Sequence, residues 1–305
     1  SILIPAMVAQ GYDAGFSSAL SAISGSLGTV IPPSITFIIY GMITGESIGD
    51  LFLSGIVPGL IFGFMLCIMV FIKSKKNGWK GDTQRASLKE IGRLFLDTIW
   101  GLLSPVIVLG GIYSGLFTPT EAAAVAVVYS LIVGIFIYKE LRLTELKETL
   151  FSTAKTTGMI LLIIMNAGIF SWVLTQQGIA ASLTEMALAL TDNRYIMLFI
   201  INIVFLCAGC VMDNTSALYI LVPIIMPIAK ALDINMIQLG VILVLNLSIG
   251  QVTPPVGPNL YVAADIGKVK FEEICRRMVP LLLMSLLALL CITYIPALSL
   301  CLIPS

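Results

Sequence analysis

The sequence predicts an all-α protein that crosses a membrane several times, and three observations lead to this prediction. Of its 305 residues, 58% are hydrophobic and 11% are charged, whereas soluble domains carry about 25% charged residues. The mean hydropathy is +1.03. Short polar stretches separate apolar runs of about 20 residues, which is the length of a helix that spans a bilayer. So few charges cannot form a water-facing surface, and lipid must therefore surround the chain.

The apolar runs give the elements in chain order. Ser1 lies inside an apolar run without a basic n-region, so we expect no signal peptide and a start inside a longer protein. The stretch 73–93 is expected to be a polar loop, and 139–157 a polar loop with an interfacial amphipathic helix. Helices are expected near 1–12, 53–72, 94–114, 119–138, 157–176, 195–209, 213–230 and 279–302, with a Thr-Pro break inside 94–138.

The basic residues cluster in the polar stretches and thereby predict the topology. Of the 17 Lys and Arg residues, seven lie in 73–93, four in 139–155 and four in 268–277, and the first 72 residues contain none. Clustered Lys and Arg between apolar runs mark cytoplasmic loops. We therefore place these three segments on the cytoplasmic side.

Two segments, 14–44 and 236–266, are too long for one crossing, and a glycine and a double proline interrupt each of them midway. Each is predicted to be a re-entrant hairpin, in which two half-helices meet at a tip inside the membrane. The segments match at a constant offset of 222 residues, since Gly28-Thr-Val-Ile-Pro-Pro-Ser34 aligns with Gly250-Gln-Val-Thr-Pro-Pro-Val256. The chain therefore contains an internal repeat.

The repeat organises the chain into two related parts. The first part covers 1–72, and the second covers 158–305 and has a further broken helix near 210–213. Counting the crossings between them makes the two parts inverted, so that the first hairpin enters from the periplasm and the second from the cytoplasm. Duplicated, inverted halves with interrupted helices at corresponding positions are typical of secondary transporters.

The proline breaks carry this functional interpretation. A double proline removes two N–H donors and ends the preceding helix, which leaves backbone groups that lipid cannot satisfy. Such backbone persists in a membrane where it lines a polar cavity or coordinates an ion. The alternative is a kink in a packed helix, but the same break occurs at two equivalent positions.

Polar groups gather around the two tips. Hydroxyl, amide and carbonyl oxygens are hard ligands that suit Na⁺, and the half-helix after each tip should offer free N–H groups to a carboxylate. The alternative for scattered small residues is close helix packing. The Na⁺ ligands are expected among Ser24, Ser26, Gly28, Asn246, Ser248, Gly250, Thr253, Pro255 and Asp213.

Three further polar residues lie inside apolar runs. Asp213 has no Lys or Arg nearby in the sequence, and an acid at such depth is usually functional; it could also cap a half-helix that begins at Asn214. Glu121 follows Thr118-Pro119, and for it a helix-capping role and an ion-site role stay equally open. Asn166 is a weaker candidate.

Composition excludes several other chemistries. The chain has no histidine, which excludes His-based acid–base catalysis and His-ligated zinc or haem. Cys207 and Cys210 form a CxxC pair within an apolar run, and we interpret these buried thiols as small hydrophobic side chains. The net charge of zero argues against a nucleic-acid partner.

Several motifs together resemble the large membrane subunit of TRAP transporters, the tripartite ATP-independent periplasmic systems, including those for sialic acid and C4-dicarboxylates. The resemblance runs over essentially the whole chain, with the motifs in the same order. The matching stretches are Pro5-Ala-Met, Gly11-Tyr-Asp13, Gly28-Thr-Val-Ile-Pro-Pro-Ser-Ile35, Tyr40-Gly41, Leu51-Phe-Leu-Ser-Gly-Ile-Val-Pro-Gly59, Phe117-Thr-Pro-Thr-Glu-Ala-Ala-Ala124, Asp213 and Thr253-Pro-Pro-Val-Gly257.

The resemblance implies an elevator-type secondary transporter in the bacterial inner membrane. Such a protein would couple the import of a small organic acid to a Na⁺ gradient. It would work with a small four-helix membrane subunit and with a periplasmic substrate-binding protein, and it would need no organic cofactor. The substrate contacts are then expected among Ser34, Thr36, Asp213, Asn214, Thr215 and Thr253. Neither tip carries the basic residue that an Arg clamp for the carboxylate would need.

Three other functions stay open from the residues alone. A stand-alone divalent-anion/Na⁺ symporter with the same paired hairpins would take up substrate without a binding protein. An intramembrane enzyme would need a second carboxylate or a metal set beside Asp213, and none is evident, so we expect no enzyme. A channel would show unitary conductance, whereas inverted hairpins favour alternating access.

Overall fold

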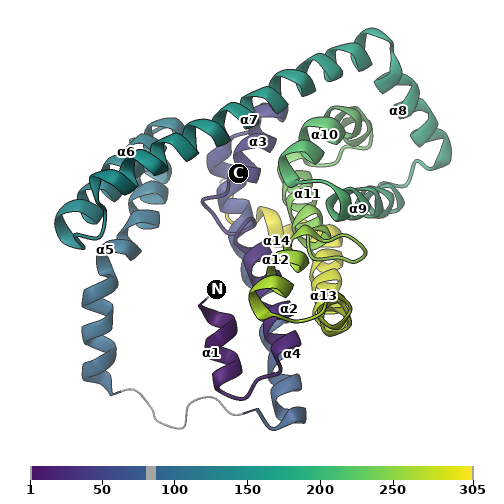
Figure 1. Ribbon diagram of the computed structural model, residues 1–305. Helices are drawn as coiled ribbons and strands as arrows, with labels where there is room; N and C mark the ends of the chain where they lie inside the picture. The colour runs from purple at the N-terminus through teal and green to yellow at the C-terminus, as the bar shows by residue number, and fades with distance from the viewer. Residues whose placement is uncertain (1, 80–86, 304–305) are drawn as a thin grey trace. The chain divides into compact units, whose positions relative to one another are not determined.

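The structure, a computed structural model, describes residues 2–79 and 87–303, and every regular element within these ranges is helical (Figure 1). Seven of the described helices are long and apolar enough to cross a membrane, which agrees with the predicted all-α polytopic fold. They are α4 (Ile48–Asn77), α5 (Leu88–Tyr113), α6 (Pro119–Ile132) with the π-helix η1 (Val133–Ile137), α7 (Leu143–Gln176), α9 (Arg194–Val211), α10 (Asn214–Ala231) and α13 (Phe271–Tyr294).

The remaining helices are shorter, and side-chain caps fix the start of several. Asp13 accepts from Phe16 N, and Asn235 from the amides of Ile237 and Gln238, because the first N–H groups of a helix have no acceptor within it. The shorter helices are α1 (Leu3–Ala9), α2 (Ala14–Leu27), α3 (Ile35–Thr44), α8 (Ile179–Leu190), α11 (Met236–Gly250), α12 (Pro258–Gly267) and α14 (Ala297–Leu300).

The chain divides into two compact units. Unit 1 comprises Ser1–Asp82 and Ala167–Ser305, and unit 2 comprises Thr83–Asn166. In unit 2, α5 packs against α6, and the Tyr129 hydroxyl donates to the carbonyl of Trp100 at 2.6 Å. Both proline-broken segments lie in unit 1, and so does the α9–α10 break.

Several helix boundaries differ from the predicted ones. α7 is one continuous helix from Leu143, so of the polar loop and the separate interfacial helix expected over 139–157 only residues 139–142 lie outside it. Within α7 the hydroxyls of Thr149, Thr153 and Thr156 each donate to the carbonyl four residues earlier, which is compatible with an uninterrupted helix. The expected loop over 73–93 is shortened from both sides, since α4 continues to Asn77 and Ser87 caps α5; its central residues 80–86 lie outside the described ranges.

Three other boundaries also move. α13 begins eight residues earlier than expected and ends at Tyr294, two residues before Pro296, which starts the short α14. α1 covers only part of the helix expected over 1–12. α8 was not predicted, because its twelve residues are too few for a crossing and follow Gly178, which has a positive φ.

The helix boundaries follow the offset of the repeat. α2, α3 and α4 begin at residues 14, 35 and 48, and α11, α12 and α13 begin 222 or 223 residues later. The peptide bonds Pro32–Pro33 and Pro254–Pro255 are both cis. Each double proline lies between the first two helices of its set of three, between α2 and α3 or between α11 and α12.

The contacts of α13 relate the starts of the two repeats to each other. At its start, the Arg277 guanidinium lies 2.8 Å from the Asp13 carboxylate, which caps α2. Near its end, the Gln238 side-chain amide, in the first turn of α11, donates to the carbonyl of Thr293 at 3.1 Å. These positions are sixteen residues apart, about 24 Å at a rise of roughly 1.5 Å per residue. The two repeats therefore start from opposite ends of α13.

The re-entrant hairpins expected over 14–44 and 236–266 stay a prediction. Each arm of these broken segments packs mainly on other helices: α2 packs on α12 and α13, and α3 on α10 and α11. α2 and α12 are antiparallel, since Ser18 lies against Gly267 and Ser26 against Asn259. α11 packs most extensively on α9, which belongs to the same repeat, and also on α4 and α13, and every residue of α11 from Gln238 to Gly250 is buried.

Candidate ion and substrate site

The first link between the two breaks is a hydrogen bond between two hydroxyls. Thr29 Oγ1, just after α2, contacts Ser248 Oγ, near the end of α11. Each hydroxyl also lies within hydrogen-bonding distance of a carbonyl of its own segment, Thr29 of Ser26 and Ser248 of Val244. A hydroxyl has one proton and two lone pairs. The two hydroxyl oxygens therefore keep lone pairs that these hydrogen bonds do not use, at the point where the repeats meet.

Asn259 makes a second link between the breaks. Its side-chain Nδ2 donates to Ser26 Oγ at 3.0 Å and to Gln251 Oε1 at 3.1 Å. Under the offset of 222, Ser26 corresponds to Ser248 and Thr29 to Gln251. The hydroxyl contact in one half therefore has a counterpart in the other, where the Asn259 amide joins the two side chains.

The break between α9 and α10 lies against the second double-proline break. The Gly257 N–H donates to the carbonyl of Cys210 at 3.3 Å. α9 and α11 approach closely, because a Cβ added at Gly250 would lie 2.6 Å from the Cα of Gly209. Asp213 follows Cys210 by three residues. The structure thus brings all three interrupted helices together.

Asp213 caps α10, and capping was one of the two roles predicted for it. Its Oδ2 accepts from Ser216 N at 3.0 Å, and its Oδ1 accepts from Ser216 Oγ at 2.6 Å. Its side chain is exposed, whereas the neighbouring Asn214 is only 7% exposed and its Oδ1 has no hydrogen-bond partner. The capping role is confirmed, and ion binding by Asp213 stays a prediction.

The helix starts differ in what they can offer a carboxylate. In α12 the expected free N–H groups are absent, because Pro258 has none, Asn259 N donates to the carbonyl of Gln251, and Leu260 N to that of Gly257. In α3 and α10, Ser34 and Asp213 each cap only the third amide. The first two amides of α3 and of α10 have no acceptor within their helix.

Of the other predicted residues, some lie among these contacts and some do not. Ser34 and Thr36 are buried at the start of α3, and Thr253 Oγ1 donates to the carbonyl of Ile249 at 2.7 Å. Thr215 is half-buried in the first turn of α10. Like Asp213, three more of the predicted Na⁺ ligands are exposed, namely Ser24, Gly28 and Pro255.

Asn246 is fully buried in α11, at 0% exposure. Its Nδ2 donates to Asn202 Oδ1 at 2.6 Å and to the carbonyl of Ile242 at 2.9 Å, while its Oδ1 has no partner. Asn202 in turn donates to Thr293 Oγ1 at 3.0 Å. This polar chain crosses from α11 through α9 to α13.

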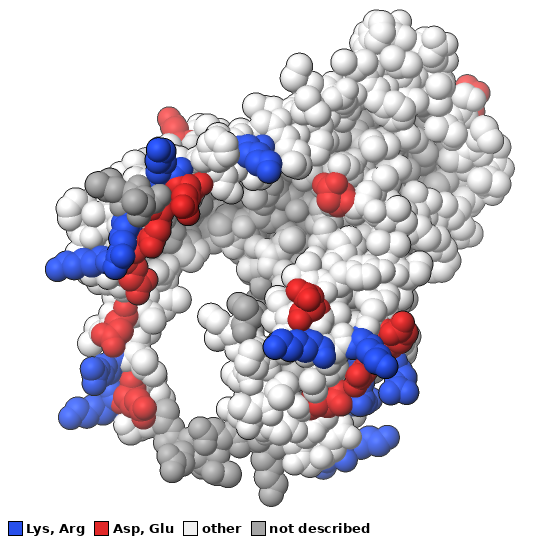
Figure 2. Space-filling view, viewed as in Figure 1, with Lys and Arg blue, Asp and Glu red and all other residues white. Residues whose placement is uncertain are grey.

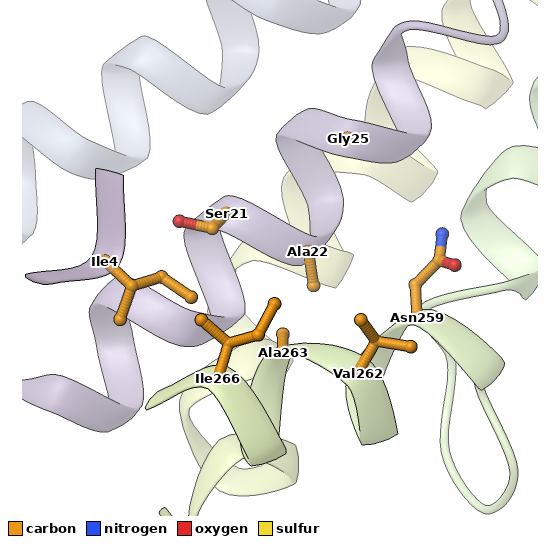
Figure 3. A pocket seen from close by; sticks show the side chains of 8 residues that line it. All are labelled: Ile4, Ser21, Ala22, Gly25, Asn259, Val262, Ala263 and Ile266. Carbon is orange, nitrogen blue, oxygen red and sulfur yellow. The ribbon is translucent and has the colours of Figure 1, made fainter. Parts of the chain in front are cut away.

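A cavity of about 300 Å³ adjoins the linked breaks, between α1, α2 and α12 (Figure 3). Its walls are mainly apolar, and Asn259 stands at one end of it. The Ser21 hydroxyl, which also lines it, is buried and has no partner. The cavity therefore offers a few neutral polar groups in an otherwise apolar wall.

The site carries no buried charge. Among the described residues, none of the buried side chains belongs to Asp, Glu, Lys or Arg, and no three His, Cys, Asp or Glu side chains gather as a metal cluster. Figure 2 shows the same pattern from outside: most of the drawn face is uncharged, and charged side chains form a few clusters. Apart from the exposed Asp213 carboxylate, an ion bound at the breaks would meet neutral oxygens.

Sequence reasoning missed Gln251, Asn202 and Thr293. Gln251 lies inside the repeat motif and aligns with Thr29, so the offset could have identified it. Asn202 and Thr293 carry no motif, and only the packing of α9 and α13 against α11 reveals them. Glu121 forms a capping box with Thr118, whose N–H donates to Glu121 Oε2 at 2.8 Å, so capping is its structural role.

Comparison with known proteins places this geometry in context. A family model described as "Tripartite ATP-independent periplasmic transporter, DctM component" matches residues 1–298. The isethionate TRAP transporter permease protein DctMQ of Oleidesulfovibrio alaskensis is 41% identical over 297 residues, which are 97% of this chain and 47% of that protein. The chain thus spans about half of this relative's length.

Two other relatives are covered more fully. The C4-dicarboxylate TRAP transporter large permease protein DctM of Pseudomonas aeruginosa is 42% identical over 302 residues, 99% of this chain and 70% of that protein. The sialic acid TRAP transporter large permease protein SiaM of Vibrio cholerae is 36% identical over 289 residues, 95% of this chain and 67% of that protein.

Proposed function

Because the chain belongs to the DctM family of TRAP transporter permeases, we propose that it imports a small organic acid across the bacterial inner membrane in symport with Na⁺. The observation that carries the proposal is the meeting of three interrupted helices in unit 1. Thr29 contacts Ser248, Asn259 joins Ser26 to Gln251, and Gly257 lies against Cys210. Each break leaves backbone and side-chain oxygens in an apolar surrounding, where a monovalent cation would be held strongly.

The neutral character of the site favours Na⁺ over a proton as the coupling ion. Proton coupling in membrane transporters generally uses ionisable side chains within the bundle. Among the described residues no Asp, Glu, Lys or Arg side chain is buried, and the chain has no histidine. Hydroxyl, amide and carbonyl oxygens can instead bind Na⁺ directly, as they bind other hard cations.

The carboxylate of the substrate would be bound without an Arg clamp. The free amides in the first turns of α3 and α10 point to Thr36 and Thr215 as contacts, supported by the positive ends of the helix dipoles. A Na⁺ ion near Thr253 would add positive charge at the second break. Substrate and cation would then each raise the affinity for the other, which is the coupling that symport requires.

By analogy with the relatives, the partners would be a small membrane subunit and a periplasmic substrate-binding protein, and unit 1 would move as an elevator that carries the breaks. Isethionate, C4-dicarboxylates and sialic acid are named for relatives, and all three are small organic acids. The substrate class proposed here is therefore organic acids of this size.

The test is uptake into liposomes that contain the purified transporter with its membrane subunit. Labelled organic acids would be offered with cognate binding protein, under an inward Na⁺ gradient or an equal K⁺ gradient. We expect uptake with Na⁺ and binding protein, and background uptake with K⁺. Equal uptake under both gradients would refute Na⁺ coupling. Uptake without binding protein would instead favour a stand-alone symporter.

A further inference from the structure

A fully buried chain of amide and hydroxyl groups connects three helices of unit 1. Asn246 of α11 donates to Asn202 of α9, Asn202 donates to Thr293 of α13, and the Thr293 hydroxyl donates to the carbonyl of Leu289 at 2.8 Å. All three side chains are at most 5% exposed. Only the far end of the chain, Asn246 Oδ1, has no partner.

The orientation of the Asn246 amide follows from its neighbours. Its nitrogen faces the carbonyl of Ile242 at 2.9 Å and the Oδ1 of Asn202 at 2.6 Å. A flipped amide would set its oxygen against these two acceptors, which is unfavourable. The oxygen must therefore face away from both, and it needs a donor or a cation, because a buried carbonyl without a partner is destabilising.

Every hydrogen bond in the chain runs in the same direction, away from Asn246 Oδ1. A positive charge at this oxygen would make the Asn246 amide a better donor, which would strengthen the next bonds to Asn202 and Thr293 in turn. A negative ligand would weaken each of them. The row of hydrogen bonds from Asn246 to Thr293 is thus polarised to favour a cation at Asn246 Oδ1.

Further oxygens lie one helical turn away. At the crossing of α9 and α11, a Cβ added to Gly250 would lie 3.0 Å from the carbonyl oxygen of Leu206, and one added to Gly209 would lie 3.0 Å from that of Leu247. The two glycines thus bring the backbone carbonyls of each helix close to the other. Asn246 precedes Gly250 by four residues on the same face of α11.

We propose that Asn246 Oδ1 is a ligand of a bound Na⁺ ion, and that Asn202 and Thr293 are positioning residues that set the affinity for this ion without touching it. The proposal rests on the proposed Na⁺ coupling and deepens it, because it assigns ion affinity to α13, a helix outside the breaks. Thr293 would act through two intervening hydrogen bonds.

The decisive variant is Thr293→Val, which removes the hydroxyl but keeps the shape. In liposomes with the complete transporter, we expect the Na⁺ concentration for half-maximal uptake to rise about five- to thirtyfold, with the maximal rate at saturating Na⁺ retained. Thr293→Ser should restore the wild-type value. Ser285→Ala is the matched control, because this buried hydroxyl of α13 donates only to the carbonyl of Leu281.

Direct binding gives an independent readout. Na⁺, compared with equal K⁺ in the absence of substrate, should raise the melting temperature of the wild type, and Asn246→Ala should abolish this rise. Two results would overturn this assignment even if wild-type uptake depends on Na⁺. One is a half-maximal Na⁺ concentration in Thr293→Val equal to that of the wild type, and the other is an Asn246→Ala variant whose melting temperature Na⁺ still raises. If wild-type uptake ignores Na⁺, the proposed function itself fails.

Discussion

Thr29 and Ser248 are 219 positions apart in the sequence, yet their hydroxyl oxygens form a hydrogen bond where the two repeats meet. Each residue lies next to a proline break of its own repeat, and the hydrogen bond joins the two breaks. The candidate site is therefore a product of the duplication. It could not exist in one repeat by itself.

The first prediction concerns this pair. Thr29→Val and Ser248→Ala should each lower stability, and the double variant should lose less than the sum of the two. We expect a coupling of about 0.5–1.7 kcal/mol, the range for hydrogen bonds between membrane helices. Thermal unfolding in detergent of the four proteins of the cycle measures this energy. Strict additivity would show that the two hydroxyls do not interact.

The second prediction concerns the crossing of α9 and α11. Gly250→Ala should destabilise the protein by about 1–3 kcal/mol, because the added Cβ would lie 2.6 Å from the Cα of Gly209 and the backbones would have to separate. Gly25→Ala is the matched control, since its Cβ would meet nothing within 4 Å. A comparison of melting temperatures tests this, and equal values for the two variants would contradict the close approach.

The third prediction separates the two roles of Asp213. Asp213→Asn keeps an efficient helix cap but removes the charge, whereas Asp213→Ala removes both. If Asp213 also binds the ion, the Asp213→Asn variant should retain wild-type stability and lose Na⁺-driven uptake. The Asp213→Ala variant should lose Na⁺-driven uptake and also about 1 kcal/mol of stability. Full Na⁺-driven uptake in Asp213→Asn would leave capping as the only role of this residue.

The sequence was sufficient to locate the breaks but not the partners of their arms. The matching double prolines identified both interruptions, because proline acts on its own backbone wherever it stands. Which helix each arm packs against depends on the whole bundle. The packing of α2 against α12, which belongs to the other repeat, therefore could not be predicted from the breaks alone.

The candidate residues divide in the same way. Ser26, Ser248 and Thr253 were predicted from the repeat and lie at or next to the convergence of the breaks. Asn202 and Thr293 could not be predicted, because a single polar residue in an apolar helix gives no local signal of its partner. Ser24 was predicted from its place near the first double proline, but its position in the helix turns it to the exposed face.

α13 has a mechanical consequence for transport. Its first turns are tied to the start of α2 through Arg277 and Asp13, and its last turn is tied to the start of α11 through Thr293 and Gln238. α13 thus contacts the starts of both α2 and α11, which lie about sixteen residues apart along this one helix. A displacement that moves either break through the bilayer must take the other with it, so the ligands would travel as a set and keep their mutual geometry.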